Sequence, residues 1–349
     1  MLIDAKRLIL IALFVAAFFT YGCGKLPKPE EVLPAVEETE EQPDAEPPPT
    51  VVREQPVQTA EEVVSDFVES PPRRKTDEAL LAIAEQTEQI AEIEELLLGG
   101  SAVSDLGAAA LPRFPALKRV HLSGSRVSGK SLEYANAAPN LEVLGFNAIP
   151  LEDAALKALE SNATITELSL AGTSIGDAAF ESLATLEHLQ VLDVSANDQV
   201  LGRTFTDLVK RKRFGELRSL SANNSGFGYY GLLEIKSLRN LEHLSAADSF
   251  VTDEALTGLR GSKSLKTLHL HNNRITSAGL SQLRGLTQLE ELRLSGNRAI
   301  GDEALKFLRG LKQLRELSLG GTGCSEAAVH ELKHRHLKST RVLFGGKEL

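Results

Sequence analysis

The spacing of hydrophobic residues repeats along most of the chain with a period of 24 residues. In each repeat, a leucine or isoleucine is followed three residues later by a second apolar residue and two residues after that by a third. Apolar residues two positions apart, with a polar residue between them, are typical of a short strand that buries one side. Ten consecutive matches to one template predict a stack of structural repeats. The repeats begin at Ile93, Leu117, Leu141, Ile165, Leu189, Leu217, Leu241, Leu265, Leu289 and Leu314.

The second half of each repeat carries a helical pattern. Thr276 and Ser277 can cap a helix, and leucines then recur at spacing three from Leu280 to Leu286. The sequence therefore predicts one strand and one helix in every repeat. Acids that suit the N-terminus of a helix stand at similar positions in three other repeats, namely Asp177, Asp253 and Asp302.

The pattern L-x-x-L-x-L-x-x-N resembles that of leucine-rich repeats and covers about 250 of the 349 residues. The resemblance implies an α/β solenoid, a curved horseshoe with parallel strands on the concave face and helices on the convex face. Ten repeats and a terminal strand would fill residues 93–349. A helix in every repeat is similar to the ribonuclease-inhibitor-like subclass of this family.

The ninth position of the repeat is asparagine, serine or threonine everywhere except in the third repeat, which has Ile149. These three polar side chains can form hydrogen bonds with backbone groups inside a turn. Isoleucine cannot, so we expect an altered turn at Ile149.

The N-terminus has the features of an export signal. Lys6 and Arg7 precede a short apolar stretch that ends at Gly22-Cys23. This end resembles the lipobox of bacterial lipoproteins, although Thr20 and Tyr21 depart from its usual residues. The resemblance implies a signal peptide at 1–22 and lipidation of Cys23. Ordinary cleavage near Gly22 and an uncleaved anchor are the alternatives.

Residues 23–75 are predicted to be a disordered acidic tether. Ten of the chain's 14 prolines fall within 26–75, together with thirteen acidic and five basic side chains. Such a composition buries too little apolar surface to offset the entropy of the chain. Residues 76–92 regain an apolar face and are predicted to form a helix that caps the first repeat.

Composition excludes several classes of function. The formal net charge is −10, and the remainder beyond the tether is mildly acidic, so a nucleic-acid partner is not expected. The two cysteines cannot form a disulfide framework, and Cys324 occupies a position that is apolar in other repeats, which predicts a buried thiol. The known nucleophile, phosphate-loop and zinc motifs are absent. We therefore expect neither an enzyme nor a cofactor.

Small and polar residues dominate the outward strand positions, which would line the concave face. We expect a ligand to bind where charged and imidazole groups interrupt them, above all at His269, His271 and Arg293 on neighbouring strands. A metal site of both histidines with Asp248 is disfavoured because Arg293 would repel a cation. An ordinary solvated surface is the alternative. The candidate ligand-binding residues are His121, Asp193, Asn223, Asp248, His269, His271 and Arg293.

The fifth repeat is four residues longer than the norm and contains the basic run 210–213. Tyr229 and Tyr230 follow in the sixth repeat. Basic residues can simply complement the C-terminal end of a helix dipole. They can also dock an acidic partner or the chain's own acidic tether, and the sequence leaves these alternatives open.

Together these features favour a noncatalytic binding protein of a bacterial cell envelope. It would be a monomer that recognises a protein or a glycan through its concave face and is held to a membrane, on the periplasmic or the outer side, by a lipid on Cys23. The competing interpretation is a structural spacer without a specific ligand, and an enzyme is a distant third because a solenoid of small side chains offers no deep pocket.

Overall fold

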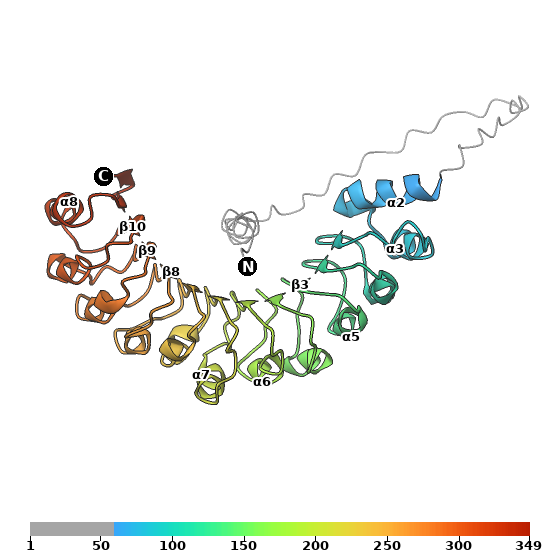
Figure 1. The fold of residues 1–349 in the computed structure, drawn as a ribbon, viewed down its shortest axis with the longest axis horizontal. Helices are drawn as coiled ribbons and strands as arrows, with labels where there is room; N and C mark the ends of the chain where they lie inside the picture. The colour runs from blue at the N-terminus through green and yellow to red at the C-terminus, as the bar shows by residue number, and fades with distance from the viewer. Residues whose placement is uncertain (1–58) are drawn as a thin grey trace, which may run out of the picture. The chain divides into compact units, whose positions relative to one another are not determined.

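A computed structural model describes residues 59–349 (Figure 1). Short strands lie side by side along the inner side of an arc, and helical segments line its outer side. All strands belong to one twelve-stranded sheet in sequence order, parallel except for the last pair. The strands are β1 (Glu95–Leu97), β2 (Arg119–His121), β3 (Val143–Gly145), β4 (Glu167–Ser169), β5 (Val191–Asp193), β6 (Ser219–Ser221), β7 (His243–Ser245), β8 (Thr267–His269), β9 (Glu291–Arg293), β10 (Glu316–Ser318), β11 (Arg341–Phe344) and β12 (Lys347–Glu348).

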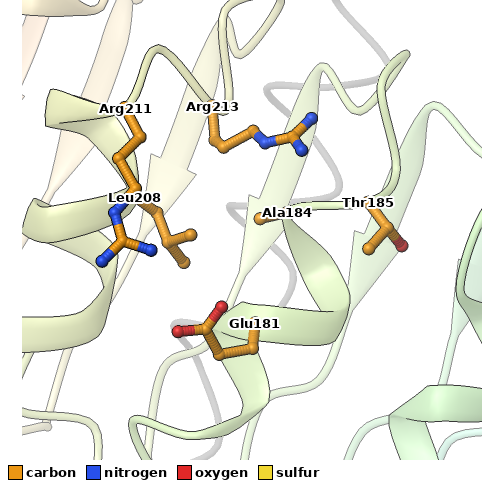
Figure 2. A pocket seen from close by; sticks show the side chains of 6 residues that line it. All are labelled: Glu181, Ala184, Thr185, Leu208, Arg211 and Arg213. Atoms are coloured by element: carbon orange, nitrogen blue, oxygen red, sulfur yellow. The ribbon is translucent and has the colours of Figure 1, made fainter.

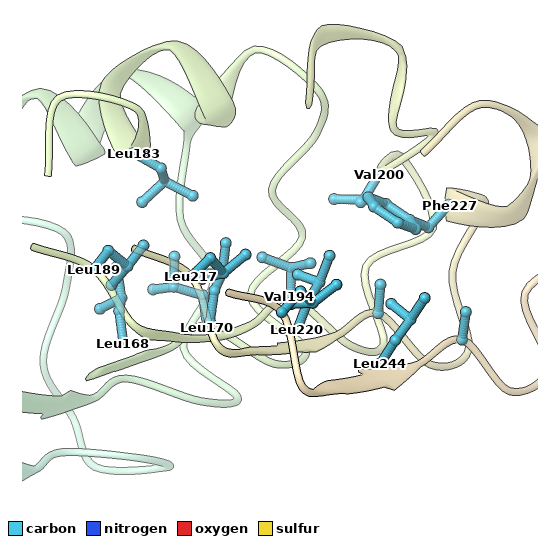
Figure 3. Close-up of a cluster of buried hydrophobic side chains, with 14 of the residues drawn as sticks. Leu168, Leu170, Leu183, Leu189, Val194, Val200, Leu217, Leu220, Phe227 and Leu244 are labelled. Carbon is cyan, nitrogen blue, oxygen red and sulfur yellow. The ribbon is translucent and has the colours of Figure 1, made fainter. Parts of the chain in front are cut away.

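The predicted solenoid and its register are confirmed. Equivalent residues of successive repeats face one another, as in the pairing of Leu244 with Leu268 and of Leu268 with Leu292. The apolar residues of the template form one continuous buried core, part of which is shown in Figure 3. Cys324 belongs to this core, as predicted, and burial raises the pKa of its thiol.

Every repeat has a helical segment, as predicted, but several of these segments are 3-10 and not α-helical. Leucines at spacing three, such as Leu280, Leu283 and Leu286, suit the three residues per turn of a 3-10 helix. The ribonuclease-inhibitor-like subclass therefore stays a prediction. The α-helices are α2 (Ala60–Glu69), α3 (Asp77–Ala84), α4 (Asp105–Ala108), α5 (Ser131–Ala137), α6 (Ala179–Leu183), α7 (Arg203–Lys210) and α8 (Glu326–Arg335). The 3-10 segments are η2 (Pro72–Arg74), η3 (Leu111–Arg113), η4 (Asp153–Leu159), η5 (Phe227–Tyr229), η6 (Ile235–Ser237), η7 (Ala255–Leu259), η8 (Gly279–Gly285) and η9 (Asp302–Phe307).

The N-terminal cap is larger than predicted. Helix α2 lies inside the segment 23–75 that composition assigned to a tether. It begins with a capping box between Thr59 and Glu62, and it buries Val64 and Phe67 against the core. The predicted helix at 76–92 is confirmed only in part, because α3 ends at Ala84 and turns follow it. The signal peptide, Cys23 and the tether up to residue 58 lie outside the described residues.

Asparagines at the ninth position hold neighbouring turns together. Asn297 donates from Nδ2 to the carbonyls of Leu270 and Leu294, both at 2.8 Å, and its Oδ1 accepts from the backbone N–H of Ile275. Asn197 and Asn273 form equivalent bonds. The predicted role of this position is therefore confirmed for the asparagines, whereas Oγ of Ser125 in the second repeat has no hydrogen-bond partner within the described residues.

The turn at Ile149 differs less than expected. Ala148 has a φ of 56°, in the left-handed region that glycines occupy at the same position of neighbouring repeats. Ile149 is buried, and the N–H of Leu151 donates to the carbonyl of Thr173 at 2.7 Å. This bond reaches the ninth residue of the next repeat, as the bond from Ile275 to Asn297 does, so it does not replace the side-chain acceptor that Ile149 lacks.

A second ladder connects the loops that lead from the strands to the helical segments. Asp253, for example, accepts from the backbone N–H of Thr276 in the next repeat at 2.8 Å and from its hydroxyl. The sequence assigned these acids to helix starts, but their main bonds join one repeat to the next. Members of this aspartate ladder are Asp77, Asp105, Asp153, Asp177, Asp253 and Asp302.

Candidate functional site

The densest cluster of charges on the concave face crosses β8 to β12. His269 Nε2 lies 2.8 Å from Glu291 Oε1, and Arg293 Nε lies 2.6 Å from the same oxygen. The Arg293 contact is an ion pair and not a hydrogen bond, because its Nε has no hydrogen-bond partner within the described residues. The Arg293 guanidinium also lies 3.4 Å from Glu316. Arg341 continues the row by pairing with Glu316 and Glu348. We call this set of residues the concave charge row.

The charge row corrects the expectation that His269 is an open contact point. Its side chain is only 11% exposed, because Glu291 and Arg293 lie over it from the next strand. The Arg293 side chain is 40% exposed and presents the positive charge of the cluster to solvent. Arg293 and not His269 is therefore the residue that a ligand can reach.

Four predicted site residues come together on β7 to β9. His271 is half-buried, and within the described part of the chain its Nδ1 has no hydrogen-bond partner. Asp248 is exposed in the preceding turn, at a φ of 53°, and receives a weak bond from Asn272 at 3.4 Å. No group of three or more metal-binding side chains occurs among residues 59–349. The cluster thus offers an imidazole, a carboxylate and a guanidinium for hydrogen bonding.

The other three predicted residues lie elsewhere on the face. His121 is on β2, six strands from β8, and its Nε2 is 3.7 Å from Glu95. Asn223 accepts from Ser245 and Ala247, so its side chain is engaged in holding the strands. Asp193 accepts from the N–H of Ser195 at 2.9 Å. The seven candidates therefore do not form one site.

Burial shifts the pKa of several groups on this face. It raises the pKa of Asp193, against hydrogen bonds from Ser195 and Ser169 that lower it. It lowers the pKa of His243 and His271, which favours their neutral forms. The bond from His269, followed by the charges of His269 and Arg293, holds the pKa of Glu291 below its usual range. Glu291 is thus ionised at neutral pH.

We expect the melting temperature of the repeat domain to fall when the pH is lowered from 7.5 to 5.5. The unfolded chain protonates His243 and His271 near their ordinary pKa of 6.5, whereas the folded chain resists protonation. A lowered folded pKa means that stability is lost as the pH falls through 6.5 toward that folded value. Glu291 has a folded pKa below its ordinary value of 4.5, so its protonation affects stability only below pH 4.5 and not between pH 7.5 and 5.5.

The measurement is a pair of thermal melts at the two pH values. His243→Gln should reduce the fall in melting temperature. The matched control is His188→Gln, because the His188 side chain is 53% exposed. An equal fall in wild type and in His243→Gln would contradict the role of the buried imidazole.

Sequence reasoning missed Glu291, Glu316 and Arg341 because it examined the strand positions between and after the core leucines. The residue just before the second core leucine also faces outward, since side chains alternate along a strand. That position is acidic or basic in several repeats and supplies most ion pairs of the face. The alternation of side chains along each strand is enough to identify this position from the sequence.

The basic run in the fifth repeat lies on the convex side. Lys210 pairs with Asp207 at 3.2 Å, and Arg213 lies 3.9 Å from Glu187. Arg211 and Arg213 line a pocket of about 410 Å³ between α6 and α7, to which Glu181 also contributes (Figure 2). Acids thus offset the cations, and this favours a structural role at the end of α7.

Two family models match parts of the chain. Residues 161–184 match a model described as a Leucine Rich repeat, and residues 263–308 match one described as Leucine Rich repeats (2 copies). These two segments of the chain are similar to leucine-rich repeats. No curated protein matches the chain in sequence.

Solved leucine-rich-repeat structures resemble the fold. An internalin from Listeria monocytogenes has a TM-score of 0.51 at 19% identity, over 81% of this chain and 90% of the internalin. A leucine-rich-repeat protein from Leptospira interrogans has a TM-score of 0.51 at 19% identity, over 74% and 68% of the two chains. TLR13 in its ssRNA13 complex has a TM-score of 0.54 at 22% identity, over 73% and 36%. At these identities the likeness supports the fold alone.

Within residues 59–349, no helix combines the length and the apolar character that crossing a bilayer requires.

Proposed function

We propose that this protein is a noncatalytic recognition scaffold that binds a protein or glycan partner through its concave face. The observation that carries the proposal is the concave charge row, in which the 40% exposed Arg293 is held by Glu291 and Glu316. Fixed by two carboxylates, the guanidinium loses little side-chain entropy when it meets an acceptor on a partner. Outward donors fixed in this way favour a ligand that carries hydroxyl, carbonyl or carboxylate oxygens.

The composition of the face supports a partner of modest affinity. Serine, alanine and glycine fill much of it, and tryptophan is absent from the chain. Tight protein interfaces depend on tryptophan, tyrosine and arginine anchors. A solved neighbour, TLR13, was captured with ssRNA13. The net negative charge of the present chain argues against that class of partner.

The test is affinity capture from an envelope extract, read by mass spectrometry, with wild type and Arg293→Ser as baits. We expect Arg293→Ser to lose the captured partner. Its free energy of unfolding should stay within about 0.5 kcal/mol of the wild-type value. Arg309→Ser is the matched control, because Arg309 is exposed outside the concave face and the charge change is identical. Equal capture by both variants, or no specific partner for wild type, would favour the structural spacer.

The proposal extends to location: an exported, monomeric protein anchored to a bacterial membrane by a lipid on Cys23. The support is the apolar stretch that ends at Gly22-Cys23 and the acidic, proline-rich composition that follows it.

We expect Cys23→Ser to move the protein from the membrane fraction to the soluble fraction, because the serine hydroxyl cannot accept the thioether-linked lipid. Immunoblots of fractionated cells measure the partition, with Cys324→Ser as a control that changes a buried cysteine in the core. Unchanged partition of Cys23→Ser would refute lipid anchoring.

A further inference from the structure

Large apolar residues replace the aspartate of the ladder in two consecutive repeats, whereas the second and eighth repeats have the small residues Gly129 and Ser277 at this position. At the position that holds Asp153, Asp177 or Asp253 in other repeats, the fifth repeat has Leu201 and the sixth has Tyr229. Their side chains are exposed by 38% and 46%. An aspartate there bonds to the next repeat, so structure alone gives no reason for an exposed apolar residue. Large exposed apolar groups that lie together mark interaction sites.

Tyr229 belongs to a continuous row of aromatic rings and arginines. The Arg203 guanidinium lies over the Tyr230 ring at 4.6 Å, and the Tyr230 and Tyr229 centroids are 6.5 Å apart. Tyr229 stacks on Phe250 at 5.4 Å and 15°, and Arg274 lies over Phe250 at 4.8 Å. This row of five side chains crosses the fifth to eighth repeats on the loops between strands and helical segments. We call it the aromatic row.

Backbone conformation fixes the row in place. Phe250 is 41% exposed and has a φ of 60°, in the left-handed region that is unfavourable for a bulky residue. Ser174 has the same conformation at the same repeat position, with a φ of 65°. Gly228 donates to the carbonyl of Ser249 at 2.9 Å, and a Cβ at Gly228 would meet that oxygen at 2.2 Å. This close approach brings Tyr229 against Phe250. Strain of this kind is concentrated at functional sites.

The charge of the row is positive and unbalanced. Within residues 59–349, neither Arg203 nor Arg274 forms an ion pair with an acid. Two neighbouring acids are engaged, since Asp177 accepts four backbone N–H groups and Asp253 binds Thr276, and exposed Asp248 forms no ion pair within the described residues. A guanidinium stacked on a ring keeps the N–H groups at its edge free for a carboxylate.

We propose that the aromatic row is a second docking surface, which binds an acidic segment of a protein partner. Two unpaired guanidiniums at its ends provide charge complementarity, and the exposed rings between them can contact an apolar side chain. A protein is favoured over a glycan because sugars stack on free ring faces. Here the neighbouring rings and arginines already cover faces of Phe250 and Tyr230. Tyrosine and arginine are also the residues that dominate protein interfaces.

The proposal is tested with a fluorescein-labelled peptide in which glutamates flank one phenylalanine, titrated by anisotropy against the full chain. A lysine version of the peptide and a sulfated polysaccharide are the comparison probes. We expect the acidic peptide to bind more tightly than both, with an affinity that weakens as salt screens the charges.

Two double variants separate the contributions of rings and charges. Tyr229→Ser with Phe250→Gly removes the rings without a change of charge and installs residues that other repeats carry at these positions, namely Ser277 and Gly226, so the melting temperature should not fall. Arg203→Gln with Arg274→Gln keeps the rings. We expect each pair to weaken peptide binding at least about tenfold, which corresponds to 1.4 kcal/mol. Arg309→Ser should leave binding unchanged.

Three results would overturn the proposal. The first is no binding of the acidic peptide to wild type. The second is equal peptide binding by wild type and both double variants. The third is that wild type binds the polysaccharide more tightly than the acidic peptide and that both double variants abolish this binding. The aromatic row would then recognise a glycan. The concave-face variant Arg293→Ser should bind the peptide normally, so this test is independent of the proposed concave site.

Discussion

Leu268→Asp is expected to destabilise the repeat domain by several kcal/mol. Leu268 is fully buried and lies between Leu244 and Leu292 of the neighbouring strands. An unpaired carboxylate there either stays charged without a partner or takes up a proton, and both are costly in an apolar core. Because each repeat packs only on its neighbours, the damage should spread to the seventh and ninth repeats first.

Thermal and urea unfolding followed by circular dichroism measure the effect. Thr257→Asp is the matched control, because it changes the charge equally at an exposed residue of η7. The control should stay close to wild type. A cooperative transition of Leu268→Asp at the wild-type midpoint would contradict the register of the sheet.

Asn297→Ala is expected to cost about 3 kcal/mol, the sum of two or three buried backbone groups that lose their partners. The carbonyls of Leu270 and Leu294 and the N–H of Ile275 would all be left without the asparagine side chain. Because these groups belong to the eighth and ninth repeats, the substitution should also loosen the contact between the two.

A graded comparison tests this role. Asn297→Ser should lose less stability than Asn297→Ala, since serine occupies the same position in four other repeats. Asn240→Ala is the control, because exposed Asn240 donates a single bond to the carbonyl of Gly215. Free energies of unfolding from urea titrations give the ranking. Equal losses of stability for Asn297→Ala and Asn240→Ala would show that the hydrogen bonds of Asn297 between repeats do not contribute to stability.

The repeat register could be predicted because it depends on a strict period. Each strand must place the equivalents of Leu268 and Leu270 inward, and a shift by one residue would expose all of them. The asparagine position followed from the same register, since few side chains can bond to backbone on both sides of a turn. These features depend on sequence alone.

Helix α2 could not be predicted from composition. Its segment contains acids and follows many prolines, and its stability comes from Val64 and Phe67 packing on α3 and the first repeat. Tertiary contacts of this kind leave little trace in local composition. The local signals were the capping pair Thr59 and Glu62 and the apolar residues at 63, 64, 67 and 68, whose spacing fits one face of a helix.

The candidate site was predicted in part. His269 and Arg293 are adjacent, as the register required, but the covering of His269 by Glu291 depends on rotamers that spacing does not encode. The aromatic row escaped prediction for a similar reason. It requires the left-handed backbone at Phe250 and the approach of Gly228 to Ser249, and neither follows from a periodic pattern.

Strand β12 has a consequence for how copies of this molecule meet. It turns back at Gly345 and Gly346 and pairs antiparallel with β11 through Leu343 and Phe344. An open parallel edge would accept the first strand of another copy, and such additions generate filaments. Here the edge is covered by a strand of two exposed, oppositely charged residues, Lys347 and Glu348. Within the described residues, the hairpin thus covers the edge of β11 that another copy would otherwise extend.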